Sequence, residues 1–162
     1  MEKALTAREI GLALKAAGLD PMVASIDYYH ISLDGERYMV FTGNLPDVYI
    51  RKMVPAEQFE FLEKPWILAS ALNAVNGQFS PVSVASLDEN LVFILCIEPA
   101  SYESLVASLP RRLEQLEHAV DRFAHVCDVF VRDEQQDEFD EVTSQLTNPT
   151  PDSPWLQGQK AA

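Results

Sequence analysis

The segment LVFILCI, residues 91–97, is followed shortly by LPRRLEQLEHAVDRFAHVCDVF, residues 109–130. The first segment is continuously apolar but too short to cross a membrane, which is typical of a strand covered on both faces. In the second segment apolar residues recur at steps of four and three, which predicts a helix with one apolar seam: Leu109, Leu113, Leu116, Val120, Phe123, Cys127 and Phe130. Together the two segments predict a sheet that packs on a long helix.

Length and composition favour one globular domain. The 162 residues, of which 48% are hydrophobic, suffice for a two-layer core. No window approaches the roughly 18 apolar residues of a membrane span. The N-terminal residues 1–6 lack the apolar run of a secretory signal, so we expect a cytoplasmic protein. Cys96 and Cys127 are expected to be small core residues rather than a disulfide or redox pair.

The net charge of −13 is the most informative feature of the composition. From Asp133 onward seven acidic residues stand against Lys160 alone, which gives −6 and leaves −7 on residues 1–132. An acidic surface repels phosphate backbones, so nucleic acid is not an expected partner. The charge suits a solubilising role, or a partner with a basic or amphipathic segment.

The first half of the chain predicts one helix and three strands. Thr6-Ala7-Arg8-Glu9 has the form of a capping box, which starts a helix. Asp34-Gly35, between residues 28–33 and 36–42, is typical of a hairpin with a type I′ turn. Residues 48–54 follow as a third strand, so the three strands form an antiparallel meander.

The second half predicts two helices and two more strands. Residues 55–63 allow either a helical turn or a loop. A helix begins at Pro65, and its apolar side is expected to contain Trp66, Leu68, Ala69, Leu72 and Val75. Residues 79–87 and 91–97 are strands, and Pro110 predicts a kink or break in the long helix that follows. The predicted fold class is therefore α+β, with an antiparallel sheet of about five strands packed against helices.

The composition changes after residue 132. Residues 1–132 are expected to form the domain, and residues 133–162, which are acidic and contain several prolines, a mobile tail. One short acidic helix in the tail would carry Phe139, Val142 and Leu146 on one side. Trp155 is a docking residue for a partner, a residue that folds back on its own domain, or a residue without a special role.

The sequence contains few candidate catalytic or metal-binding residues. His30 alternates with neighbours on a strand and has no obvious partner, and the hydrolase, nucleotide-binding and redox motifs are absent. Spacings of four, three and four place one metal-binding set on a single helical face, away from the apolar seam: Glu114, His118, Asp121 and His125. We expect this set to face water. The sequence therefore predicts no catalytic residue, metal site or cofactor.

Two groups of residues are candidates for binding or bracing. Four tyrosines on the first three strands would supply amphipathic contact area for a partner, although ordinary sheet packing explains them equally well: Tyr28, Tyr29, Tyr38 and Tyr49. Asn73 and Asn76 stand three apart just before Gly77. Because asparagine bonds readily to nearby backbone, we expect this pair to satisfy the helix end or brace the following loop, rather than to bind a substrate.

The order helix, three strands, helix, two strands, helix resembles the type III secretion chaperone-like fold. Residues 66–130 resemble the YbjN-like family within that fold, through the pair Asn73-x-x-Asn76, a strand pair around Asp88-Glu89 and a helix that opens at Ser101-Tyr102-Glu103. The chain is also similar to a branch known from uncharacterised cyanobacterial proteins. The resemblance covers most of residues 1–132 and none of the tail.

The resemblance implies a binding protein. Type III chaperones are small, acidic, often dimeric, and hold extended amphipathic segments of a client without catalysis, whereas YbjN-like proteins are regarded as sensory regulators. The family supplies no catalytic residues to carry over. The last helix here is longer than that of a typical chaperone, and nothing suggests a neighbouring secretion system.

Three functions remain open from sequence alone. The first is a non-enzymatic module that holds a partner polypeptide on its sheet or helix surface. The second is a regulator that binds a small ligand between sheet and helix, and the third, least favoured, is an enzyme. We also expect a homodimer that shares a helix or a sheet edge, unless the whole seam packs on its own sheet.

Overall fold

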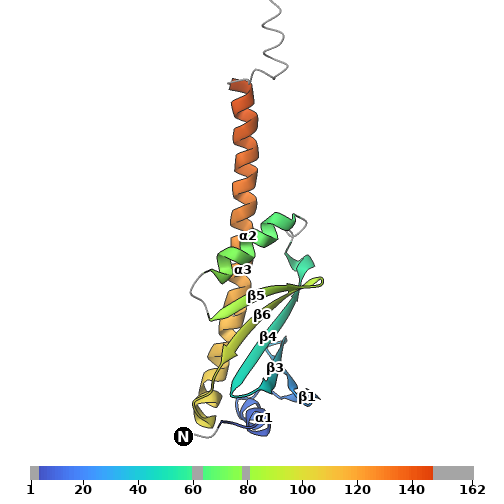
Figure 1. Cartoon of the computed structure of the whole chain (residues 1–162), viewed down its shortest axis with the longest axis vertical. Coiled ribbons are helices and arrows are strands. Elements are labelled where there is room, and N and C mark those ends of the chain that lie inside the picture. Colours follow the sequence, from blue (N-terminus) through green and yellow to red (C-terminus); the bar gives the residue numbers. More distant parts are fainter. Residues whose placement is uncertain (1–3, 60–63, 78–80, 148–162) are drawn as a thin grey trace, which may run out of the picture.

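A computed structural model describes residues 4–59, 64–77 and 81–147. It contains three α-helices and a six-stranded antiparallel sheet with the strand order β1-β2-β3-β4-β6-β5 (Figure 1), which confirms the predicted α+β class. The elements in chain order are α1 (Ala7–Ala16), β1 (Met22–Ser25), β2 (Tyr28–Leu33), β3 (Glu36–Asn44), β4 (Asp47–Pro55), the short 3-10 helix η1 (Ala56–Gln58), α2 (Pro65–Asn76), β5 (Val82–Leu87), β6 (Asn90–Ile97) and α3 (Tyr102–Thr147).

The helix cap and the turn predicted in the first half of the chain form as expected. The Thr6 side chain accepts a hydrogen bond from the Glu9 backbone at 3.2 Å, and the Glu9 carboxylate accepts one from the Thr6 backbone at 3.1 Å. Asp34 and Gly35 both have positive φ, at 53° and 81°, which a type I′ turn requires. Strand β1 was not predicted, because its four residues, MVAS, are all exposed and lack an alternating pattern.

The core lies between one face of the sheet and the seam of α3. Phe93 of β6 and Phe123 of α3 meet edge to face with ring centroids 5.9 Å apart, and Phe59 packs on the other side of Phe123 at 5.2 Å. The seam positions from Leu109 to Cys127 are buried or half-buried, and Phe130 is half-buried against the same core. The seam therefore packs largely within its own chain.

Three side chains lie outside the core in which they were expected. Strand β6 is covered by helices on one face only, so Cys96, which alternates with the buried Leu95 and Ile97, is exposed. Helix α2 buries Ile67, Ala71 and Val75, which repeat every four residues, and this row leaves Trp66 47% exposed and Ala69 exposed as well. In both cases the element forms as predicted, but it presents a different side to the core.

Helix α3 differs most from expectation. It runs without interruption through Pro110, so the break that we allowed for at this residue does not occur. It also continues to Thr147 and extends well beyond the sheet (Figure 1), so residues 133–147, expected to belong to a mobile tail, are helical. The mobility of the tail stays a prediction, and Trp155 lies outside the described residues.

No helix in the described ranges is long and apolar enough to cross a membrane.

Candidate functional site

The sheet has two faces of different character. Alternate residues of β2, β3, β4 and β6 point toward α1 and α3 and are buried, for example Val40, Ile50 and Phe93. We call this the covered face. The residues between them point the other way, and we call this the open face. Val92 is buried there, whereas the others are exposed or half-buried and lie outside the core: Tyr28, His30, Met39, Phe41, Tyr49, Arg51, Met53, Ile94 and Cys96.

An aromatic cluster crosses three neighbouring strands of the open face. Tyr28 pairs with Phe41, and Phe41 pairs with Tyr49, with ring centroids 4.9 and 6.2 Å apart. The Arg51 guanidinium lies 5.4 Å from the Phe41 ring centroid, and its Nη1 donates to the Tyr28 hydroxyl at 3.3 Å. The Nε–H of Arg51 is buried and has no hydrogen-bond partner among the described residues. The cluster therefore combines apolar rings with hydroxyl groups and a cation, and the Arg51 guanidinium makes only part of the hydrogen bonds available to it.

The structure divides the four predicted tyrosines between the two faces. Tyr28 and Tyr49 lie on the open face. Tyr29 points to α1, where its hydroxyl donates to the Ala7 carbonyl at 2.9 Å, and Tyr38 is buried under α3. Tyr29 and Tyr38 therefore cannot contact a partner that docks on the open face.

Tyr38 belongs to a polar network inside the covered face. Its hydroxyl donates to the Glu117 carboxylate at 2.6 Å, and Lys52 forms ion pairs with Glu117 and, at 2.8 Å, with Glu36. Burial, followed by the hydrogen bond to Glu117, raises the pKa of Tyr38 well above its ordinary value. Burial alone would lower the pKa of Lys52, but the hydrogen bonds to the two carboxylates outweigh it and raise this pKa. The network ties α3 to the middle of the sheet.

The two edges of the sheet also differ. The edge strand β1 is exposed along its whole length, and its surroundings present Met22, Val23 and Ile26 with exposures of 69%, 74% and 91%. At the other edge, the Asn76 side chain donates to the Val84 carbonyl at 2.8 Å and accepts from the Val84 amide at 2.9 Å. Asn76 thus occupies backbone groups of β5 that a further strand would use, whereas β1 remains accessible.

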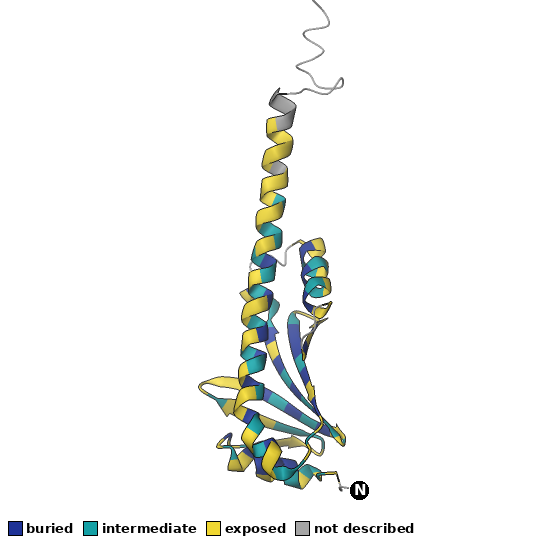
Figure 2. Cartoon of the chain, turned by 90° about the vertical axis from the view of Figure 1, so that its left-hand side faces the viewer, coloured by how far each residue is buried: buried dark blue, intermediate teal, exposed yellow. Residues whose placement is uncertain are grey.

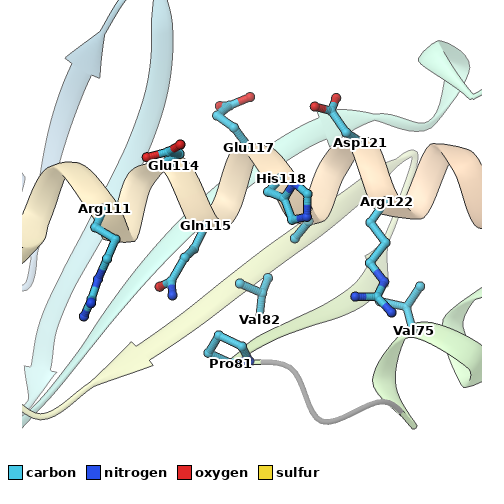
Figure 3. A pocket seen from close by; sticks show the side chains of 11 residues that line it. Val75, Pro81, Val82, Arg111, Glu114, Gln115, Glu117, His118, Asp121 and Arg122 are labelled. Carbon is cyan, nitrogen blue, oxygen red and sulfur yellow. The ribbon is translucent and has the colours of Figure 1, made fainter.

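A groove of about 670 Å³ lies between α3, the end of α2 and the start of β5. Its apolar lining is formed by Val75, Pro81, Val82 and Ala119. On α3, one row of side chains repeats at steps of four, three and four: Arg111, Gln115, His118 and Arg122. Figure 3 shows Arg111, Gln115 and Arg122 on the side of α3 that faces Pro81, Val82 and Val75, with Arg122 ending beside Val75, whereas Glu117 and Asp121 point away. Two arginines therefore lie beside the apolar floor, and the three carboxylates that also line the groove lie on its outer side.

The remaining candidate residues do not gather into a site. Glu114, His118, Asp121 and His125 are exposed, and the first three line the groove, but no group of three side chains within the described parts of the chain is placed to hold a metal ion. His30 is exposed on the open face. Asn73 contributes its backbone carbonyl, which accepts from the Gly77 amide at 2.9 Å. Burial, aided by the charge of Asp128, raises the pKa of Cys127 to about 11, which makes this thiol unreactive.

Comparisons with known proteins support the fold. No protein-family model and no curated protein matches the chain. Among solved structures, YbjN from E. coli, described as a proposed transcription regulator, superimposes with a TM-score of 0.52 at 13% sequence identity, covering 80% of this chain and 94% of YbjN. The chain has the YbjN-like fold. At this identity the likeness shows the fold alone, so function must be argued from the surfaces described above.

Sequence reasoning missed Phe41, Arg51 and the groove. Alternation along residues 36–42 and 48–54 places Phe41 and Arg51 on the same side as Tyr28 and Tyr49, so the aromatic cluster was available from the strand pattern. The groove could not be predicted from the strand pattern, because it depends on how the end of α2 and the start of β5 pack beside α3.

Proposed function

We propose that this protein is a non-enzymatic binding module that holds an extended segment of a partner polypeptide. The segment would lie on the open face and could pair with the β1 edge by strand addition. The single observation that carries the proposal is the aromatic cluster of Tyr28, Phe41 and Tyr49 around Arg51, outside the core. Tyrosine and arginine are the residues that most often dominate binding energy at interfaces.

The exposed β1 edge of the sheet and the charge of the chain support this function. An unprotected edge strand pairs readily with another chain, and the apolar exposure of Met22, Val23 and Ile26 makes β1 such an edge. The acidic chain, with a net charge of −13, favours a client whose segment is basic or amphipathic.

We further propose that the protein is cytoplasmic and a homodimer, and that it resembles the cyanobacterial branch of its fold. These three statements stay predictions.

Co-purification followed by mass spectrometry tests the proposal. The double variant Phe41→Ser/Tyr49→Ser removes the aromatic surface, and we expect it to lose a client that the wild-type protein retains. Leu12→Ser is the matched control, since Leu12 is a 49% exposed apolar residue of α1, away from the open face. A client retained equally by all three proteins, or no specific client at all, would overturn the proposal. Circular dichroism must show that each variant is folded.

The groove favours a second candidate function, a sensory regulator that binds a small organic anion. Its volume of about 670 Å³ falls within the range of small-molecule sites, and its apolar floor lies beside Arg111 and Arg122. An anion with an apolar body would place its charge on a guanidinium and its body on Pro81 and Val82.

A thermal-shift screen of organic acids and organic phosphates, each paired with a neutral analogue, tests this second function. A ligand that binds the folded state raises the melting temperature with increasing concentration. We expect Arg122→Gln to abolish such a shift. Arg132→Gln, on the same helix but outside the groove, should leave it unchanged. A flat response to every anion would remove this candidate.

A further inference from the structure

The charges in the middle of the open face have the opposite sign to the chain as a whole. Figure 2 shows buried and less buried residues alternating along the strands, and on the side of the open face this alternation forms three rows that cross the sheet. The second row contains His30 and Arg51, and the third contains Arg37. The rows, which lie entirely within the described residues, contain no aspartate or glutamate: Tyr28, Phe41, Tyr49 and Cys96; His30, Met39, Arg51, Ile94 and Ser83; Ser32, Arg37, Met53, Val92 and Ala85. On a chain with a net charge of −13, this surface is therefore cationic.

The carboxylates that the alternation of β4 and β6 places on the same side lie at the ends of these strands. Asp47 begins β4 and Glu98 follows the end of β6, each two residues beyond the first row. Asp47 is separated from Arg51 by roughly 13 Å along an extended strand, which exceeds the screening length of about 8 Å at physiological salt. On the covered face Lys52 has two carboxylate partners, whereas Arg51 forms no ion pair among the described residues. The cation of the open face is therefore left for an acceptor outside the fold.

The surroundings of the Arg51 guanidinium favour a carboxylate as that acceptor. A guanidinium has five N–H groups, and among the described residues the one acceptor for them is the Tyr28 hydroxyl, at 3.3 Å from Nη1. Donors that are shielded from water without a partner cost free energy. A carboxylate can take up two N–H groups of a guanidinium at once, and the neighbouring Phe41 ring, 5.4 Å away, lowers the local dielectric and strengthens such a pair.

We propose that the open face selects an amphipathic client segment whose charged residue is an aspartate or a glutamate, and that Arg51 binds its carboxylate. The inference rests on the proposed function and adds the kind of client. In an extended segment, side chains two residues apart point to the same side, so an acidic residue and its apolar neighbours would reach Arg51 and the rings of Phe41 and Tyr49 together. Of the two kinds of client that the net charge allows, a basic one would bring its cations against Arg37 and Arg51, which repel them. The open face therefore fits the amphipathic one.

Selection from a phage-displayed library of short random peptides tests which segments the open face accepts. We expect the peptides that are enriched on the wild-type protein, and that Phe41→Ser/Tyr49→Ser does not retain, to combine aromatic or aliphatic residues with an aspartate or glutamate. Enriched peptides that are basic, or that lack an acidic residue, overturn this inference and leave the proposed function standing. If no peptide is enriched on the wild-type protein, the inference and the proposed function both fail.

Affinity measurements with matched peptides test the role of Arg51. Each enriched peptide is synthesised with its acidic residue and with the corresponding amide, asparagine or glutamine. We expect the wild-type protein to bind the amide form about 10-fold or more weakly, because a hydrogen-bonded charge pair is lost. Equal affinity of the two forms for the wild-type protein overturns the inference, and this comparison needs no folded variant.

Two arginine variants assign the effect to a residue. Arg51→Met should bind the acidic and amide forms equally, with an unchanged or raised melting temperature, because it removes a cation that the fold does not pair. Arg8→Met is the matched control: it removes the same charge from an exposed position of α1, on the other side of the sheet, and should keep the wild-type difference. A difference between the two peptides that persists in Arg51→Met, or that disappears in Arg8→Met, contradicts the assignment of the carboxylate to Arg51.

Discussion

The covered and open faces of the sheet are made of the same strands but differ in what they contain. On the covered face, Val40, Ile50 and Phe93 are fully buried against helices, and Lys52, the one buried charged residue in the described part of the chain, is held by two carboxylates. On the open face, Phe41 and Arg51 contact each other outside the core. The requirements of the fold account for the covered face. The open face holds apolar and aromatic groups that the core does not use, which is why we propose that the partner binds there.

The first way to test this comparison is to place a charge in the covered face. Leu116→Asp introduces a carboxylate at a position with 0% exposure on the α3 seam. Burying an unpaired charge costs several kcal/mol, out of a total stability of about 5–15 kcal/mol for a domain. We therefore expect loss of the cooperative unfolding transition in a circular dichroism melt.

Phe130→Asp provides the graded control for Leu116→Asp. Phe130 is only half-buried at the end of the same seam, so we expect a folded protein with a lowered melting temperature. A normal melt for Leu116→Asp would mean that α3 does not pack on the sheet as described.

The polar network of the covered face should have the next largest effect. Lys52→Met removes both ion pairs and leaves Glu117 with the Tyr38 hydroxyl as its partner. Losing hydrogen bonds to charged groups should lower the free energy of unfolding by about 1–3 kcal/mol in urea titrations. Tyr38→Phe, which removes one hydroxyl, should cost less. Equal stability of Lys52→Met and wild type would show that the network contributes little.

The same network predicts how stability depends on pH. The pKa values of Tyr38 and Lys52 are both raised in the folded protein, so the folded state retains protons that the unfolded chain loses above about pH 10. Stability from these groups is therefore complete below that pH and is lost as the pH rises further. We expect the melting temperature to fall more steeply above pH 10 in the wild type than in Lys52→Met/Tyr38→Phe. Parallel curves would contradict the raised pKa values.

Sequence reasoning succeeded where a signal is local and failed where side-chain direction depends on packing. The capping box at Thr6 and the Asp34-Gly35 turn form as predicted, because the hydrogen bonds of the cap and the backbone angles of the turn depend on only a few neighbouring residues. Cys96 and Trp66 were placed in the core because apolar character alone does not say which side of an element is covered. Residues 133–147 were taken for a tail because they lack core residues, although Glu and Gln are good helix formers.

The edge contact of Asn76 should have a smaller effect than the buried network. Asn76→Ala removes two hydrogen bonds to Val84 and exposes the backbone of β5. We expect a loss of about 1–2 kcal/mol in the free energy of unfolding and faster amide exchange along β5. Asn73→Ala is the matched control, because among the described residues Asn73 contributes its backbone carbonyl, which this substitution keeps. Equal losses for the two variants would contradict a specific bracing role for Asn76.

The smallest effect on stability is expected on the open face, and there the comparison is most informative. Tyr49→Ser removes an aromatic side chain that contacts Phe41 outside the core, so the free energy of unfolding should change by less than about 1 kcal/mol. Its covered-face counterpart is Ile50→Ser, one residue along the same strand at 0% exposure, which should cost several kcal/mol. If Tyr49→Ser instead unfolds the domain, the open face is part of the fold and not a surface reserved for a partner. If Tyr49→Ser is stable but loses the client that the wild type retains, the open face is the functional one, because a residue that the fold does not need is then needed for binding.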